Sequence, residues 1–263
     1  MITSTSNNKI KKVNALQKKA RLRKEEGLFV VEGIKMFKEV PKELLKEVYV
    51  SEDFFENNKE EIEKYAAGKV EIVSRNVLEY MSDTVTPQGI LCLVKQPSHS
   101  LVDIINLFKK SKKDKNRFLI LEDIRDPGNL GTIIRTSEAA GVTGVIMSLE
   151  TADIFNPKVV RSTMGSIFRL PFVYVKDIKE AVESLQKCGI KTYATSLDAD
   201  RYVDEISLSK NCAFLIGNEA NGLHKETCEL ADELVKIPMD GGVESLNAAI
   251  SAAVLIYYHK LAK

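Results

Sequence analysis

Apolar residues recur along the first 95 positions with two different periods. Ile10, Val13 and Leu16 are three residues apart, which predicts an amphipathic helix over 8–24. Short apolar runs bounded by breaking residues are typical of strands. The remaining predicted elements are helices at 33–40 and 54–66 and strands at 29–31, 47–51, 70–73 and 90–94. We therefore expect a small α/β domain over residues 1–95.

The pattern changes after residue 96. Residues 96–116 are polar and basic around one short helix, and we interpret them as a linker. From residue 117 to residue 263 apolar strands alternate with helices, which favours a parallel sheet covered on both faces. The predicted strands are 118–121, 144–148, 172–175, 191–194, 213–216 and 234–237, and a helix over 245–261 follows them. Ligands of such sheets bind beyond the carboxyl ends of the strands.

Charge is balanced overall but not locally. The chain has 38 basic and 37 acidic residues, yet the first 24 residues contain no acid. A basic segment of this kind is typical of a surface that binds phosphate backbones, and a solvated helix face is the alternative. The candidate RNA-binding residues are Lys9, Lys11, Lys12, Lys18, Lys19, Arg21 and Arg23. A second basic run at 109–117 fits a solvated linker better than an RNA contact.

Several classes of protein are disfavoured. No stretch approaches the ~20 apolar residues that span a bilayer, and the amino terminus has no apolar core of a secretory signal. The four cysteines are widely spaced and form no CxxC pair, so we expect reduced thiols in the cytoplasm and no metal site. The three histidines do not cluster with acids in the sequence, and we expect each at the surface.

The first loop of interest follows the strand 118–121. Asn129 and Arg135 lie at the start of the next helix, where free backbone N–H groups favour an anion. The Arg135 guanidinium can hold a phosphate through two hydrogen bonds. A capped loop whose arginine pairs with a surface acid is an equally good interpretation.

Two further loops follow later strands. Gly217, with Glu219 close behind, would let a ligand approach the backbone, although a turn before a capped helix is the favoured interpretation of this loop alone. Ser245 is predicted as the N-cap of the last helix, which puts the Asn247 amide in its first turn. The alanines at 248, 249, 252 and 253 give this helix a small-residue face suited to a helix or subunit interface.

The glycine motif of dinucleotide-binding folds and the P-loop of nucleotide triphosphatases are both missing from the sequence. Taken together, the three loops resemble the SpoU (TrmH-type) RNA ribose 2′-O-methyltransferases of the SPOUT superfamily. Its motifs DPxNxGxxxR, GxExxGL and IPMxGxxxSLN are filled at every fixed position, in order, over 126–135, 217–223 and 237–247. The resemblance covers roughly 117–263, and residues 1–95 look like the L30e-like substrate-binding domain found in this family.

The resemblance implies an α/β knot, in which the carboxyl-terminal segment threads through a loop as a trefoil. It also implies S-adenosylmethionine as the methyl donor, bound in the knot largely by backbone groups. The positions carried over for this cofactor are Gly217, Ile237 and Leu246, with Thr195 and Met239 as neighbours. Apolar side chains would then pack the adenine ring while backbone groups bind its edge.

The reaction implied by the resemblance is methyl transfer to a ribose 2′-hydroxyl of RNA by a homodimer joined through the knot domain. The catalytic positions carried over are Asn129, Arg135, Glu219, Ser245 and Asn247. Ribosomal RNA, 23S in particular, is favoured over tRNA, and neither a membrane nor a metal is expected. The alternatives are a non-catalytic ribosome-assembly factor, a tRNA 2′-O-methyltransferase and an enzyme that methylates a base nitrogen or a small molecule.

Overall fold

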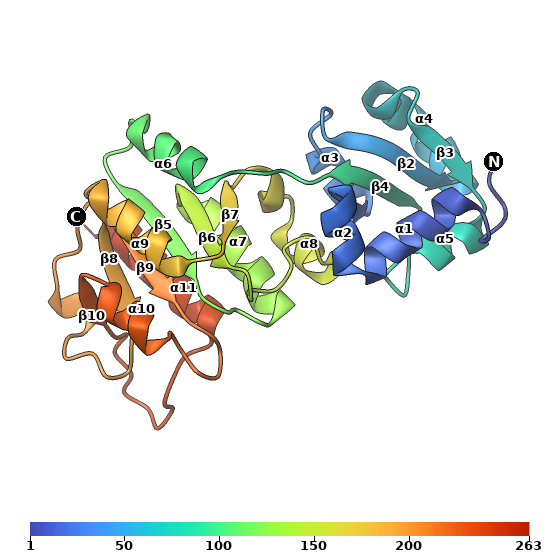
Figure 1. Cartoon of the computed structure of the whole chain (residues 1–263). Helices are drawn as coiled ribbons and strands as arrows, with labels where there is room; N and C mark the ends of the chain where they lie inside the picture. Colours follow the sequence, from blue (N-terminus) through green and yellow to red (C-terminus); the bar gives the residue numbers. More distant parts are fainter. Residues whose placement is uncertain (263) are drawn as a thin grey trace. The chain divides into compact units, whose positions relative to one another are not determined.

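The computed structural model describes residues 1–262, which divide into two units. The first unit contains residues 1–97 and, from much later in the sequence, 153–168. The second unit contains 98–152 and the chain from Arg169 onward. Figure 1 shows the elements of both units in the order of the sequence.

The first unit contains a four-stranded mixed sheet in the order β1-β4-β2-β3, in which only β2 and β3 run parallel. Its strands are β1 (Leu28–Glu32), β2 (Leu45–Ser51), β3 (Val70–Val73) and β4 (Ile90–Lys95). Its helices are α1 (Asn8–Lys18), α2 (Ala20–Glu26), α3 (Ile34–Glu39), α4 (Glu52–Ala66), α5 (Arg75–Met81) and α8 (Pro157–Thr163), with a 3-10 turn η1 (Ser166–Phe168). The smaller α/β domain predicted from the sequence is confirmed.

The basic amino-terminal helix is broken at Lys19, where the sequence predicts one continuous helix. Lys19 has extended backbone angles, φ −119° and ψ 104°. The Arg23 guanidinium turns back and hydrogen-bonds the carbonyls of Leu16 and Gln17 at the end of α1. These bonds satisfy carbonyls that a continuous helix would have bonded itself. The apolar side of α1 packs on α5 in the core of this unit (Figure 1).

Residues 153–168 complete the core of the first unit. Asp153 forms an ion pair of 2.6 Å with Arg23, whose side chain is 4% exposed. The rings of Phe155 and Phe168 lie 4.9 and 6.0 Å from the ring of Phe29 on β1. Because a buried charge is stable only when it is paired, Arg23 and Asp153 fix this segment to α2.

The second unit is built on a fully parallel six-stranded sheet, as the alternating pattern predicts. Its order is β10-β8-β9-β5-β6-β7. The strands are β5 (Asn116–Leu121), β6 (Gly144–Ser148), β7 (Phe172–Val175), β8 (Lys191–Thr195), β9 (Asn211–Ile216) and β10 (Glu233–Val235). The helices are α6 (Leu101–Lys109), α7 (Pro127–Ala140), α9 (Ile178–Lys187), α10 (Lys225–Leu230) and α11 (Ala248–Leu261), with a 3-10 turn η2 (Val203–Glu205).

Helices cover both faces of this sheet. On one face α6, α9 and α10 enclose an apolar core around Phe118 and Ile146. On the other face α7 and α11 pack against each other, and α11 contacts β9 (Figure 1). The small-residue side of α11 is buried inside the chain, since Ala248, Ala249 and Ala252 are at most 7% exposed. That face therefore serves helix packing within the subunit.

The basic residues around the start of β5 bind the carboxyl-terminal ends of these two helices. Alternate residues donate to backbone carbonyls: Lys113 to Gly141, Lys115 to Ala262, and Arg117 to Ala140 at 2.7 Å. Cations stabilise a helix carboxyl terminus because carbonyls there are free and the helix dipole is negative. The charges at these three positions thus have a structural role.

Arg117 also contacts His259, which is 1% exposed, so the prediction of a surface position for this histidine is wrong. The Arg117 Nε donates to His259 Nδ1 at 3.1 Å, which leaves the imidazole proton on Nε2 to donate to the Ser209 carbonyl at 2.9 Å. Burial lowers the pKa of His259, and nearby Arg117 and Lys115 lower it further despite the bond to Ser209. His259 is therefore held neutral on α11.

Candidate functional site

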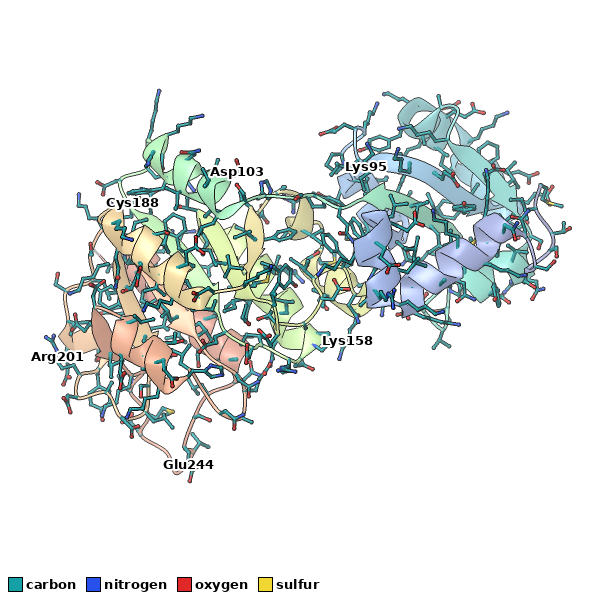
Figure 2. All side chains as sticks on the ribbon, in the orientation of Figure 1. Lys95, Asp103, Lys158, Cys188, Arg201 and Glu244 are labelled. Atoms are coloured by element: carbon teal, nitrogen blue, oxygen red, sulfur yellow. The ribbon has the colours of Figure 1, made fainter. Side chains whose placement is uncertain are left out.

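A cleft of about 710 Å³ opens in the second unit beyond the carboxyl ends of β8, β9 and β10. The loop 237–247 lies along it, and Figure 2 shows Glu244 at the outer tip of this loop. All five positions expected to bind the cofactor line the cleft: Thr195, Gly217, Ile237, Met239 and Leu246. Glu219 and Ser245 line it as well. The structure thus brings together residues from three loops that are far apart in the sequence.

Gly217 is required by the way its loop folds back on itself. Asn218 and Gly222 exchange two backbone hydrogen bonds of 2.9 Å, which close the loop 217–222. A Cβ on Gly217 would stand 2.1 Å from the carbonyl carbon of Gly222 and from the nitrogen of Leu223. Because both neighbours are backbone atoms, a side chain here would force this wall of the cleft to move.

Three polar side chains, one from each of the three sequence motifs 126–135, 217–223 and 237–247, form one hydrogen-bonded chain beside the cleft. Asn247 donates its amide to Asn129 Oδ1 at 2.9 Å, and Asn129 donates to Glu219 Oε1 at 2.8 Å. Asn247 Oδ1 caps α11, because it accepts from the backbone of Ala249 and Ile250. Each amide therefore has only one workable orientation.

The N-cap of α11 is thus Asn247 and not Ser245, which corrects the prediction. The helix begins at Ala248, and Asn247 accepts two of the free N–H groups of its first turn. Ser245 stays outside the helix in the cleft-lining loop. The last helix is therefore three residues shorter at its start than the sequence pattern indicates.

Glu219 accepts hydrogen bonds from the backbone of Arg125 and Asp126, both at 3.1 Å, as well as from Asn129. Burial raises the pKa of Glu219, but these bonds and one from its own N–H outweigh burial and hold it below the usual value. The carboxylate is therefore ionised at neutral pH. It ties the loop at the start of α7 to the loop after β9.

A second set of polar residues that the sequence did not single out supports this arrangement. Glu122, at the end of β5, is 4% exposed and accepts from Thr227 Oγ1 at 2.6 Å and from the backbone of His224 at 2.8 Å. Asn218 donates to the Asp123 carbonyl at 2.8 Å. A polar residue directly after an apolar strand was the available signal for Glu122.

Asp123 has left-handed backbone angles, with φ +59°, which are rare for a residue with a side chain. Its carboxylate accepts from Ser148 Oγ at 2.8 Å. His224 lies between acids, with Nδ1 3.7 Å from Glu122 and Nε2 3.5 Å from Asp123. The prediction that the histidines stand apart from acids is therefore wrong for His224.

Arg135 does not join this network within one subunit. It is exposed on α7, six residues after Asn129, which places the two side chains about 120° apart around the helix. Arg135 is not among the residues that line the cleft. Its guanidinium therefore faces solvent from the side of α7.

The candidate RNA-binding residues of the first unit divide into three groups. The side chains of Lys11, Lys18 and Lys19 are exposed and make no hydrogen bond or ion pair within residues 1–262. Lys9, Lys12 and Arg21 are exposed but pair with glutamates at 2.5–2.7 Å. Arg23 is buried against Asp153 and two carbonyls, so the prediction that it contacts RNA is wrong.

The cleft suits a ligand with an apolar ring and a charged tail. Its walls combine aliphatic side chains, backbone polar groups around Gly217, and charged groups at Asp198, Lys225 and Glu229. Its volume lies within the range of small-molecule and cofactor sites. In the part of the chain that the structure describes, no three His, Cys, Asp or Glu side chains are placed to hold a metal ion. Nor does any described helix have the length and apolarity to cross a membrane.

Comparisons with known proteins agree with this geometry. A family model described as the SpoU rRNA Methylase family matches residues 116–257, and one described as the MRM3-like substrate binding domain matches 7–92. A curated relative from Bacillus subtilis, 23S rRNA (guanosine(2553)-2′-O)-methyltransferase RlmP, is 31% identical over 259 residues, 98% of each chain.

Solved structures show the same fold over the whole chain. An rRNA methyltransferase from Sinorhizobium meliloti with AdoMet bound has a TM-score of 0.85 at 28% identity, covering 100% of this chain and 98% of that one. The SpoU methyltransferase AviRb from Streptomyces viridochromogenes, in complex with AdoMet, has a TM-score of 0.82 at 27% identity, covering 97% of each chain. The three filled motifs, the hydrogen-bonded chain that joins them beside the cleft, and these matches together show that the chain belongs to the SpoU rRNA methylase family.

Proposed function

We propose that this protein transfers a methyl group from S-adenosylmethionine to a ribose 2′-hydroxyl of ribosomal RNA, with 23S rRNA favoured. The observation that carries the proposal is the convergence of the three loops. They place the Asn247–Asn129–Glu219 chain at the edge of a cleft lined by Gly217 and Leu246. The names of the relatives support the reaction and the class of RNA.

The residues of the cleft would hold the cofactor. Thr195, Gly217, Ile237, Met239 and Leu246 line one continuous surface on which an adenine ring can pack against apolar side chains. When bound, S-adenosylmethionine supplies a methyl group that is already activated by its sulfonium. The protein must then align the ribose oxygen with that methyl group and exclude competing positions.

The polar chain beside the cleft would position the ribose. Asn129 has its amide fixed between Asn247 and Glu219, so its free edge can orient a hydroxyl. Glu219 stays ionised and holds the two loops together. Ser245 would complete the pocket from the loop before α11. We assign to Arg135 the role of holding the target phosphate and polarising the hydroxyl, because a guanidinium offers several N–H donors and no acceptor.

The exposed side of α11 supports a homodimer. Ile250, Val254 and Leu261 form an apolar stripe along this helix and are 50, 37 and 74% exposed. The stripe lies on the helix that packs against α7, which carries Arg135. We propose that a second copy covers this stripe and that Arg135 acts in the site that the two copies complete together. We also propose that the carboxyl-terminal segment forms the trefoil knot expected from the family resemblance.

The first unit would bind the RNA, as the substrate-binding family model over residues 7–92 supports. We assign RNA binding to the first unit, expected from the sequence at 1–95, and methyl transfer to the second unit, expected at 117–263. Most of the segment 96–116, expected as a linker, lies in the second unit, where its helix α6 packs on the sheet. The exposed Lys11, Lys18 and Lys19 offer three free charges to phosphates, consistent with recognition of folded RNA by its backbone. We place the enzyme in the cytoplasm with its rRNA substrate; the free cysteines are compatible with that compartment.

Transfer of labelled methyl from S-adenosylmethionine tests the proposal. The substrate is rRNA from a strain that lacks this gene, and the product is digested to nucleosides. We expect label in a 2′-O-methyl nucleoside. Label in tRNA alone would identify the other class of substrate, and label in a base would refute the reaction. Binding of rRNA without binding of the donor would indicate an assembly factor.

A further inference from the structure

A second cleft, of about 410 Å³, lies in the first unit. It is bounded by the start of α4, by α5 and by the loop 83–89 that leads into β4. Its lining combines apolar surface with side-chain amides. The residues that carry the argument are Phe54, Asn57, Asn58, Leu78, Val85 and Gln88.

Two glycines fix the walls of this cleft. Gly89 has a φ of +94°, and a Cβ there would stand 2.6–2.8 Å from three atoms of Phe54. A Cβ on Gly33 would stand 2.7 Å from Gln88 Oε1, which accepts from the backbone of Ile34 at 3.3 Å. The phenyl ring and the glutamine amide are therefore held in place before any ligand arrives.

The amides on α4 have unused hydrogen-bonding capacity. The helix is interrupted at Asn58, where φ is −131°. Asn57 and Asn58 each donate their Nδ2 to a carbonyl one turn earlier, at 2.8 and 2.9 Å. Within residues 1–262 neither Oδ1 accepts a hydrogen bond, so both oxygens are available to a ligand that donates.

The cleft is not a phosphate site. Its one arginine, Arg75, is bonded to Glu79 at 3.0 Å, and Asp53 adds a further negative charge. The free lysines lie elsewhere, on α1 and at its end. Leu78 connects the two regions, because it lines the cleft and belongs to the core on which α1 packs. An RNA backbone bound by these lysines would therefore leave the amide-lined cleft for an uncharged group.

We propose that this cleft binds a single unpaired nucleobase of the RNA substrate. The inference rests on the proposed function, since it assumes RNA as the partner. A planar base with polar edges and apolar faces matches a site in which a phenyl ring and Val85 offer contact area and three amides offer donors and acceptors. Unpaired bases are recognised in this way, by aromatic contact and by hydrogen bonds to their edges. Val85, fully exposed at the rim, gains burial when the base enters.

RNA affinity measured at several salt concentrations tests the proposal. The double variant Asn57→Ala/Gln88→Ala of the full chain should bind rRNA about tenfold more weakly at every salt concentration. Its dependence on salt should stay that of the wild type, because no phosphate contact is lost. By contrast, Lys11→Ala/Lys18→Ala should reduce the salt dependence. Asn76→Ala, exposed on α5 outside the cleft, is the matched control and should bind like the wild type.

Methyl NMR of the full chain gives an independent measurement. Titration with each of the four nucleoside monophosphates should shift the Val85 and Leu78 methyl signals, and one base should act at lower concentration than the others. Unchanged rRNA affinity of the double variant together with unmoved methyl signals would overturn the proposal. These outcomes are separate from failure of the proposed function, which would appear as absence of methyl transfer while base binding persists.

Discussion

Replacement of Gly217 by alanine tests how the cleft is built. The new Cβ would stand 2.1 Å from two backbone atoms, whereas ordinary contact needs about 3.5 Å, so the loop 217–222 must retreat by more than about 1 Å. That retreat weakens the two hydrogen bonds between Asn218 and Gly222, at a cost of about 1–3 kcal/mol in the free energy of unfolding. It also moves one wall of the cleft. We expect affinity for S-adenosylmethionine to fall at least about tenfold.

Calorimetric titration with S-adenosylmethionine and thermal unfolding measure the two effects. Gly241→Ala is the matched control, because it lies on a cleft loop with no atom within 4 Å of its Cβ, and it should change neither quantity. Gly222→Ala has open space but a φ of +70°, so it should cost about 1 kcal/mol of stability from backbone strain alone. Wild-type donor affinity in Gly217→Ala would refute the reasoning.

Three further substitutions probe catalysis and stability. Glu219→Gln puts an amide N–H opposite the backbone N–H of Arg125, so one hydrogen bond is lost. The methyl-transfer rate should then fall at least about tenfold while the affinity for S-adenosylmethionine stays the same. An unchanged single-turnover rate would contradict this role of Glu219. Arg135→Ala should abolish transfer and leave the donor dissociation constant within about twofold, and equal loss of donor binding would argue against the assignment. Because burial lowers the pKa of His259, the unfolded chain takes up a proton near pH 6.5 that the folded chain refuses. Wild-type stability in urea unfolding should therefore be full above about pH 6.5 and fall below it, and His259→Gln should flatten that dependence.

The sequence predicts the second unit well because its strands are parallel. The carboxyl ends of all its strands then lie along the same edge of the sheet. Because β10, β8 and β9 are neighbours, the loops that follow residues 235, 195 and 216 lie next to one another. Gly217 and Leu246 line one cleft for this reason. The order of loops along the chain is enough to place them, without knowledge of side-chain contacts.

Contacts between distant segments could not be predicted in this way. Asn247 caps α11 through its Oδ1 while its Nδ2 reaches Asn129, and periodicity alone does not distinguish it from Ser245. Arg23 reads as one more cation in a basic stretch, but its partner is 130 residues away. The left-handed backbone of Asp123 depends on Ser148, which no local pattern indicates.

The inclusion of residues 153–168 in the first unit limits how the gene for this protein can lose or exchange its amino-terminal half during evolution. Ile154, Phe155 and Val160 are buried in that unit although they are encoded inside the methyltransferase segment. A gene that lost its first 97 codons would leave these side chains exposed to water and favour aggregation. A gene that loses its first half would also need substitutions of these three residues by polar ones. Recombination that exchanges the amino-terminal half must therefore also carry this later stretch if those side chains are to stay buried.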